Sequence, residues 1–183
     1  MPCMAYSSRG IFDLMTVHTT ADGTLETRDD GRAVIRFERH LAHPVDRVWE
    51  ALTTPAEMVR WWGEGSVDLV EGGRFDVTWL NTDDEGNRAA MKATITRLDP
   101  PRLLETDGDE HGVLRWELEP EGEGTRLRFT STLELPDQFR TRHIAGWHWH
   151  LDALETILDG AEVDPVNVTG WAPIHERYVA KLG

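Results

Sequence analysis

Cysteine is almost missing from this chain of 183 residues, in which Cys3 is the only one. A single cysteine excludes an internal disulfide and fits a reducing compartment. No apolar run approaches the roughly 20 residues that a membrane-spanning helix needs. The first residues also lack the basic start and apolar block of a secretory signal. We therefore expect a cytoplasmic protein with no membrane span.

Basic residues are also few, with 19 Lys and Arg against 33 Asp and Glu and a net charge of −14. Proteins that bind nucleic acid usually present a basic face, and no Lys/Arg cluster occurs here. Nucleic acid and anionic membranes are therefore not expected partners. The acidity is typical of a solubilising surface. The length suits one domain with a real core.

Tryptophan is abundant, with eight residues. Two interpretations of these rings stay open from the sequence. They could form a tryptophan-rich core, or several of them could line a cavity, because a binding pocket needs apolar walls with few polar groups. The residues in or beside periodic segments are Trp61, Trp62, Trp79, Trp116, Trp147, Trp149 and Trp171.

The longest helical pattern runs from Pro136 to Gly160. Proline is typical of a helix start and glycine of a helix end. Apolar or aromatic positions recur three or four residues apart, which places them on one face of a helix. These positions are Phe139, His143, Trp147, Leu151, Leu154 and Leu158. A helix with so wide a stripe must pack against another layer.

Alternating patterns before this helix predict the other layer. A turn at residues 29–31 indicates a first hairpin. In its second run, residues 33–41, the face with Phe37 and Leu41 is favoured as the inner one. Arg39 shares that face, so it would need a partner. Residues 66–133 alternate through about six further strands joined by polar turns, which indicates an antiparallel meander.

Two short helices are predicted between the first hairpin and the meander. The first begins at Pro44, and the second begins after Thr54, with Glu57 three residues on as in a capping box. A last helix is predicted over residues 173–182, with Ile174, Tyr178 and Leu182 on the docking face. Helices and strands thus fall in separate blocks, which favours an α+β fold with a curved antiparallel sheet wrapped around the long helix.

Three separated stretches carry a resemblance to a known family: residues 36–62, residues 72–75 and residues 146–160. Together they resemble the START-like (SRPBCC) superfamily with its helix-grip fold, and within it the proteins homologous to the activator of the heat-shock-protein ATPase. The resemblance covers roughly residues 23–182. That superfamily includes ligand carriers, polyketide cyclases, lipid-transfer domains and chaperone cofactors, so it implies the fold and leaves the function open.

The domain organisation that follows has three parts. Residues 1–20 are expected to be a disordered extension, with Met15 as an alternative start. Residues 21–163 form the START-like ligand-binding domain. Residues 164–183 form a tail whose short helix docks on that domain.

Metal, cofactor and nucleophile chemistry find little support. His148 and His150 would point to nearly opposite sides of a helix. His143 and His150 share a face but lie roughly 10 Å apart along the axis, too far to chelate one ion. No glycine-rich phosphate cradle and no serine in a nucleophile elbow occur. We therefore expect no metal, no cofactor and no catalytic set.

The favoured function is binding of a hydrophobic or aromatic small molecule between the long helix and the sheet. Trp62 and Trp79 are expected at the mouth of that space. The full set of expected ligand-binding residues is Trp62, Trp79, Met91, Trp116, Phe129, His143, Trp147 and His150. The alternatives are a protein-binding module of the chaperone-cofactor kind and a cyclase or hydrolase with His143 or His150 as general base. Whether the chain forms a homodimer is left open.

Overall fold

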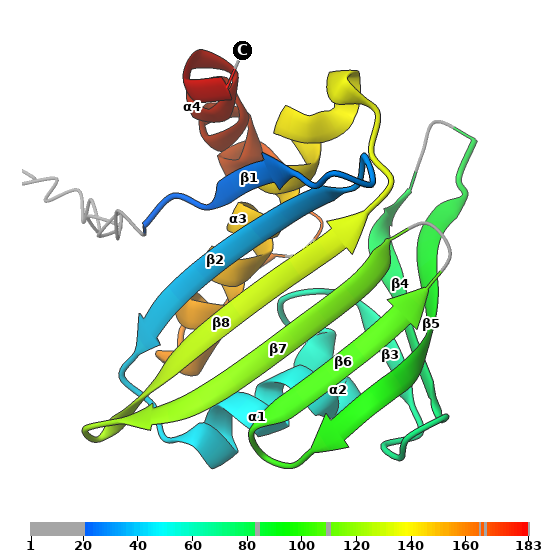
Figure 1. Cartoon of the computed structure of the whole chain (residues 1–183). Helices are drawn as coiled ribbons and strands as arrows, with labels where there is room; N and C mark the ends of the chain where they lie inside the picture. Colours follow the sequence, from blue (N-terminus) through cyan, green and yellow to red (C-terminus); the bar gives the residue numbers. More distant parts are fainter. Residues whose placement is uncertain (1–20, 83–84, 109–110, 165, 167, 183) are drawn as a thin grey trace, which may run out of the picture.

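The computed structural model describes residues 21–82, 85–108, 111–164, 166 and 168–182. The extension expected over residues 1–20 lies outside the described residues. One antiparallel sheet of eight strands has the order β1-β2-β8-β7-β6-β5-β4-β3 (Figure 1). The expected α+β class is confirmed. The strands are β1 Thr24–Thr27, β2 Ala33–Leu41, β3 Glu64–Val67, β4 Arg74–Thr82, β5 Arg88–Asp99, β6 Leu103–Gly108, β7 Gly112–Glu121 and β8 Gly124–Leu133.

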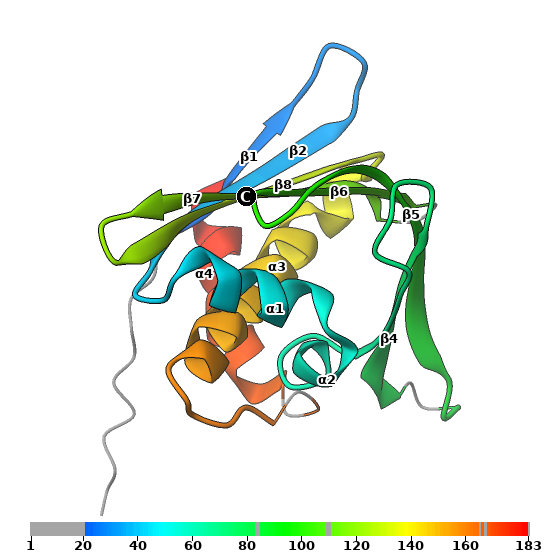
Figure 2. The ribbon, with the colours of Figure 1, turned by 90° about the horizontal axis from the view of Figure 1, so that it is seen from below.

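The helices gather on the concave side of the sheet (Figure 2). They are α1 Val45–Thr53, α2 Pro55–Met58, α3 Asp137–Leu158 and α4 Trp171–Leu182, with a 3-10 turn at Val168–Gly170. The long helix α3 lies across the sheet, and α4 packs against α3. Among the described helices, none is both long enough and apolar enough to cross a membrane.

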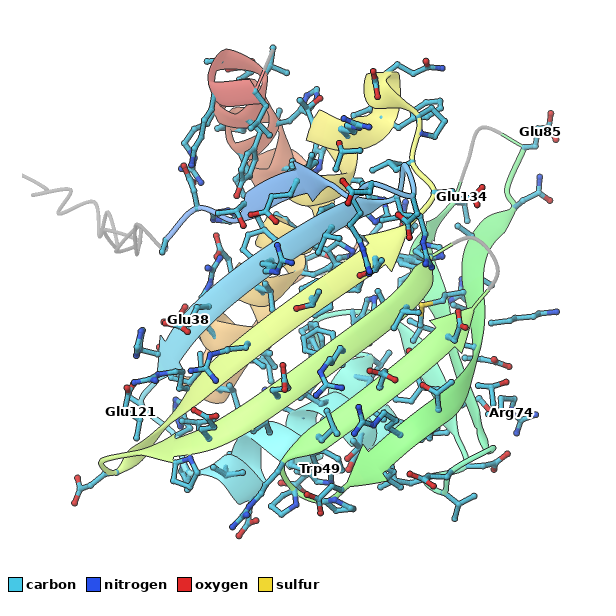
Figure 3. All side chains as sticks on the ribbon, in the orientation of Figure 1. Glu38, Trp49, Arg74, Glu85, Glu121 and Glu134 are labelled. Atoms are coloured by element: carbon cyan, nitrogen blue, oxygen red, sulfur yellow. The ribbon has the colours of Figure 1, made fainter. Side chains whose placement is uncertain are left out.

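The two faces of the sheet differ as the alternation predicts. In β2 the residues with odd numbers from 33 to 41 are buried, and Arg36, Glu38 and His40 are exposed. The outer face carries paired charges: Arg115 lies 2.8 Å from Glu105. Figure 3 shows Glu38 and Glu121 at the β2 side of this face. The charged residues of the strands thus lie mainly on the outer face, and the helices cover the apolar one.

The apolar stripe of α3 begins later than the sequence pattern suggests. Phe139 was expected on the stripe, but it is 47% exposed. The first buried residue of the helix is Ile144, so the first turns precede the stretch that packs on the sheet. Trp147, Leu151 and Leu154 are buried as expected.

The predicted capping box does not form. Thr54 is the residue before α2, but its side chain makes no capping hydrogen bond. The Glu57 carboxylate instead accepts hydrogen bonds from Arg47 at 2.6 Å and from Arg60 at 3.2 Å. Two guanidinium partners compete better for a carboxylate than a backbone N–H does. Leu69, expected in a strand, follows the end of β3 and is 37% exposed.

Arg39, on the inner face, has the partner that its position requires. Its side chain is 4% exposed, and its Nη2 lies 3.4 Å from Oδ1 of Asp152 on α3. Its Nη1 donates to the carbonyl oxygen of Ala21 at 2.6 Å. Burial lowers the pKa of Arg39, and the Asp152 carboxylate opposes that effect. The pair links β2 to the C-terminal half of α3.

Tyr178 docks the last helix as expected. It is 0% exposed, its hydroxyl hydrogen-bonds Nδ1 of His148 at 2.8 Å, and it accepts the backbone N–H of Gly23 at 2.7 Å. Burial raises the pKa of Tyr178 to about 12. Leu182, expected on the same docking face, is 42% exposed. The contact between α4 and the body is therefore centred on one hydrogen-bonded tyrosine.

Candidate functional site

The candidate site lies where α3 begins. Because β8 runs from Gly124 to Leu133 and α3 starts four residues later, the first turns of the helix lie near the same end of the sheet. The antiparallel order brings the β4–β5 and β6–β7 turns to that end as well. In Figure 3 this end of the sheet is marked by two labelled residues, Glu85 in the β4–β5 turn and Glu134 after β8.

A cluster of aromatic rings fills the space behind this end. Trp147 of α3 lies over the sheet, with its ring centroid 4.4 Å from Phe129 and 5.9 Å from Trp116. Trp62, just after α2, closes the cluster at 5.5 Å from Trp147. All four rings are at most 4% exposed. Trp62 therefore lies deeper than the mouth position expected for it.

Three rings form the rim, those of Trp79, His111 and His143. Trp79 of β4 is stacked on His111, which precedes β7, with centroids 5.1 Å apart and planes at 22°. The ring of His143, on α3, lies 6.2 Å from that of His111. His111 was missed by the sequence reasoning, because it stands in a turn with no periodic signal. It brings the β6–β7 turn into contact with the helix.

Two of the three histidines of α3, His143 and His150, form hydrogen bonds through their ring nitrogens within the protein. Nε2 of His150 accepts the indole N–H of Trp79 at 3.2 Å, and its Nδ1 donates to the carbonyl oxygen of Trp61 at 3.2 Å. Nε2 of His143 accepts the indole N–H of Trp147 at 3.3 Å. These bonds assign each ring a neutral tautomer with its proton on Nδ1.

The pKa values agree with these tautomers. Burial lowers the pKa of His143 to about 4, and His111 adds to the effect. Burial likewise lowers the pKa of His150 to about 4, although its bond to Trp61 opposes the shift. With the lone pair of each Nε2 already occupied, neither histidine offers a free general base, and the catalytic alternative gains no support.

A row of inner-face residues between the ring cluster and the rim carries two hydroxyls. Ser131 of β8 and Thr106 of β6 both pair with Leu114 of β7, one on each side. Ser131 is 0% and Thr106 is 1% exposed. Within the described part of the chain, neither hydroxyl has a hydrogen-bond partner, and the same is true of Nε1 of Trp62.

Seven of the eight expected residues thus fall in two neighbouring groups. Four belong to the deep cluster, and Trp79, His143 and His150 belong to the rim and its supports. Met91 is 2% exposed and pairs with Val77 on β4, in the same buried face. Thr106 and Ser131 were not singled out, because a hydroxyl in an alternating strand gives no distinctive pattern.

Other features of the described residues are less suited to a binding site. A hollow of about 360 Å³ on the outer face is lined by charges of both signs, among them Arg74, Asp76, Lys92 and Asp107. Arg74 is already paired with Asp68 and Asp76. No group of three or more metal-ligating side chains is found in the described ranges.

Comparison with known proteins places this fold in a family. Residues 42–159 match the model of the family described as Activator of Hsp90 ATPase homolog 1-like protein. Among curated proteins, none matches. CalU16 from Micromonospora echinospora is 28% identical, with a TM-score of 0.66 over 87% of this chain and 96% of that one. A protein of Bordetella parapertussis is 30% identical, with a TM-score of 0.65 over 81% of this chain and 86% of that one. An AHSA1-like protein from Aeromonas hydrophila is 26% identical, with a TM-score of 0.59 over 69% of this chain and 92% of that one. The family model covers well over half of the chain, which therefore belongs to the Activator of Hsp90 ATPase homolog 1-like family.

Proposed function

We propose that this protein binds a hydrophobic or aromatic small molecule between α3 and the sheet. The observation that carries the proposal is the convergence of aromatic side chains from separate elements on one space, next to the rim of Trp79, His111 and His143. Trp116 comes from β7, Phe129 from β8 and Trp147 from α3. Flat apolar walls of this kind favour a flat apolar ligand.

The ligand would enter between the rim rings and bind beside the ring cluster. Burial of its apolar surface would drive binding at roughly 25 cal/mol per Å² before entropic costs. The indole of Trp79 and the imidazole of His143 would border its path. The alternative of a protein-binding module rests on the family description, and no contact among the described residues favours it.

A fluorescent apolar probe tests this function directly. N-phenyl-1-naphthylamine gains emission when it leaves water, and we expect saturable binding of one probe per chain. Leu114 is 0% exposed and faces the space, whereas the adjacent Val113 belongs to the opposite face of β7. We expect Leu114→Phe to reduce probe binding and Val113→Phe to leave it unchanged, with circular dichroism confirming that both variants fold. Equal binding by the two variants would place the probe elsewhere.

A further inference from the structure

We propose that the ligand of this space is an uncharged molecule with a ring-sized apolar body and oxygen atoms that hydrogen-bond the hydroxyls of Thr106 and Ser131. The inference rests on the proposed function and adds the chemical class of the ligand. It would make Thr106 and Ser131 the residues that determine specificity.

The two hydroxyls are the first support. A buried hydroxyl without a partner carries a free-energy cost that an aliphatic side chain of similar size avoids. Their neighbours in the row, Ile35 and Leu114, are aliphatic and fully buried. Thr125 shows the ordinary arrangement, because it is equally buried but its hydroxyl donates to the carbonyl oxygen of His43 at 2.7 Å. An unpaired buried polar group calls for a partner from outside the chain.

The position of the hydroxyls is the second support. Thr106 and Ser131 lie two strands apart, so their Cα atoms are about 10 Å from one another across the sheet. Ser131 is two residues beyond Phe129 on the same face of β8, and Thr106 is two residues beyond Leu104, which pairs with Trp116. A ligand resting on the ring cluster would therefore meet hydroxyls at its edge rather than at its face. The indole N–H of Trp62 would offer a further donor from the cluster itself.

The charges around the space point to an uncharged ligand. Among the described residues, the buried side chains that ionise are Arg39, His148 and Tyr178. Arg39 is already paired with Asp152. Arg140, in the first turns of α3, is paired with Asp137 at 2.8 Å. Neither of these guanidinium groups is left to pair with a charged ligand, which would lose its hydration on entering.

The first experiment measures stability without any ligand. Thr106→Val and Ser131→Ala remove hydroxyls that have no protein partner, so we expect the Tm of each variant to stay the same or rise. The matched control is Thr125→Val, which removes a bonded hydroxyl and should lower the Tm by about 2–6 °C. A loss of Tm in Thr106→Val and Ser131→Ala as large as in Thr125→Val would overturn the inference, because the hydroxyls would then be satisfied within the protein.

The second experiment compares naphthalene, 2-naphthol and 2-naphthoate by quenching of tryptophan fluorescence. We expect 2-naphthol to bind most tightly and 2-naphthoate least tightly. Because 2-naphthol has one oxygen, one of the two variants, Thr106→Val or Ser131→Ala, should weaken its binding about 2- to 10-fold, and both variants should leave naphthalene binding unchanged. Thr125→Val should change neither affinity.

The outcomes separate this inference from the proposed function. Tightest binding by 2-naphthoate would contradict an uncharged ligand. Equal affinities for naphthalene and 2-naphthol in all variants would remove the role of the hydroxyls while leaving the binding function intact. No binding by any of the three compounds would overturn the proposed function, and the ligand class with it.

Discussion

Acid should destabilise this protein through His143 and His150. Each pKa is lowered in the folded chain from 6.5 to about 4, mainly by burial. A lowered histidine pKa means that the unfolded chain binds more protons between these two values. The free energy of unfolding therefore falls as the pH falls from 6.5 towards 4, and the loss is complete below 4.

The size of the effect follows from the two pKa values. At pH 5 an unfolded histidine is almost fully protonated, whereas a native one with a pKa of about 4 is about one-tenth protonated. Between pH 7 and pH 5 each histidine then removes about 2 kcal/mol, or about 4 kcal/mol for both. This is a large part of the stability of an ordinary domain. The net charge of −14 acts in the opposite direction, because protonation of surface carboxylates relieves their repulsion.

Urea denaturation followed by circular dichroism at pH 7, 6 and 5 measures this loss. Glutamine does not titrate in this range, and its amide can accept the indole N–H bond that each histidine accepts. His143→Gln and His150→Gln should each halve the pH-dependent loss, and the double variant should retain only the background of the surface charges. Identical pH slopes in the wild type and the double variant would refute the reasoning.

Three further predictions concern stability at neutral pH and use the same denaturation assay. Arg39→Met breaks the buried ion pair with Asp152 and should lower the free energy of unfolding by about 3–5 kcal/mol. Arg36→Met, on the exposed face of the same strand, should lower it by less than about 1 kcal/mol. Similar losses in the two variants would show that the buried pair does not stabilise the fold. Tyr178→Phe removes a hydroxyl with two buried partners and should lower the free energy of unfolding by about 1–3 kcal/mol, and an unchanged midpoint would show that this hydroxyl does not stabilise the docking of α4. Ile144→Ala should lower the free energy of unfolding by about 2–5 kcal/mol, and Phe139→Ala should lower it by less than about 1 kcal/mol. A larger loss for Phe139→Ala would show that α3 packs on the sheet through the face that carries Phe139.

The fold could be predicted because hydrophobic period and strand order are local signals. The alternation of residues 33–41 identified the inner face of β2, including a buried Arg39 that needed a partner. The pattern could not name that partner, because Asp152 is 113 positions away and lies on a helix side that looks polar. Phe139 was misplaced because a helical pattern does not show how far the helix extends beyond the sheet.

The rings of the candidate site were predictable, and its hydroxyls were not. Large rings at alternating or helical spacing are visible in the sequence, so Trp116, Phe129 and Trp147 could be chosen. Thr106 and Ser131 could not, because a threonine or serine in a strand is ordinary on either face. Their importance depends on an absent hydrogen bond, which only the packing of neighbouring strands can reveal.

The two halves of α3 are held in different ways, and this difference determines where a ligand can enter. The C-terminal half is fixed by the ion pair of Arg39 with Asp152 and by the bond between His148 and Tyr178, and the dense contacts of Trp147 lie at the midpoint of the helix. The half that begins at Asp137 is buried only from Ile144 onward. Separating this end of the helix from the sheet would therefore break fewer buried contacts than separating the other end. The hydroxyls of Thr106 and Ser131 lie nearer to this loosely held end, so a ligand that reaches them need not disturb the ring cluster.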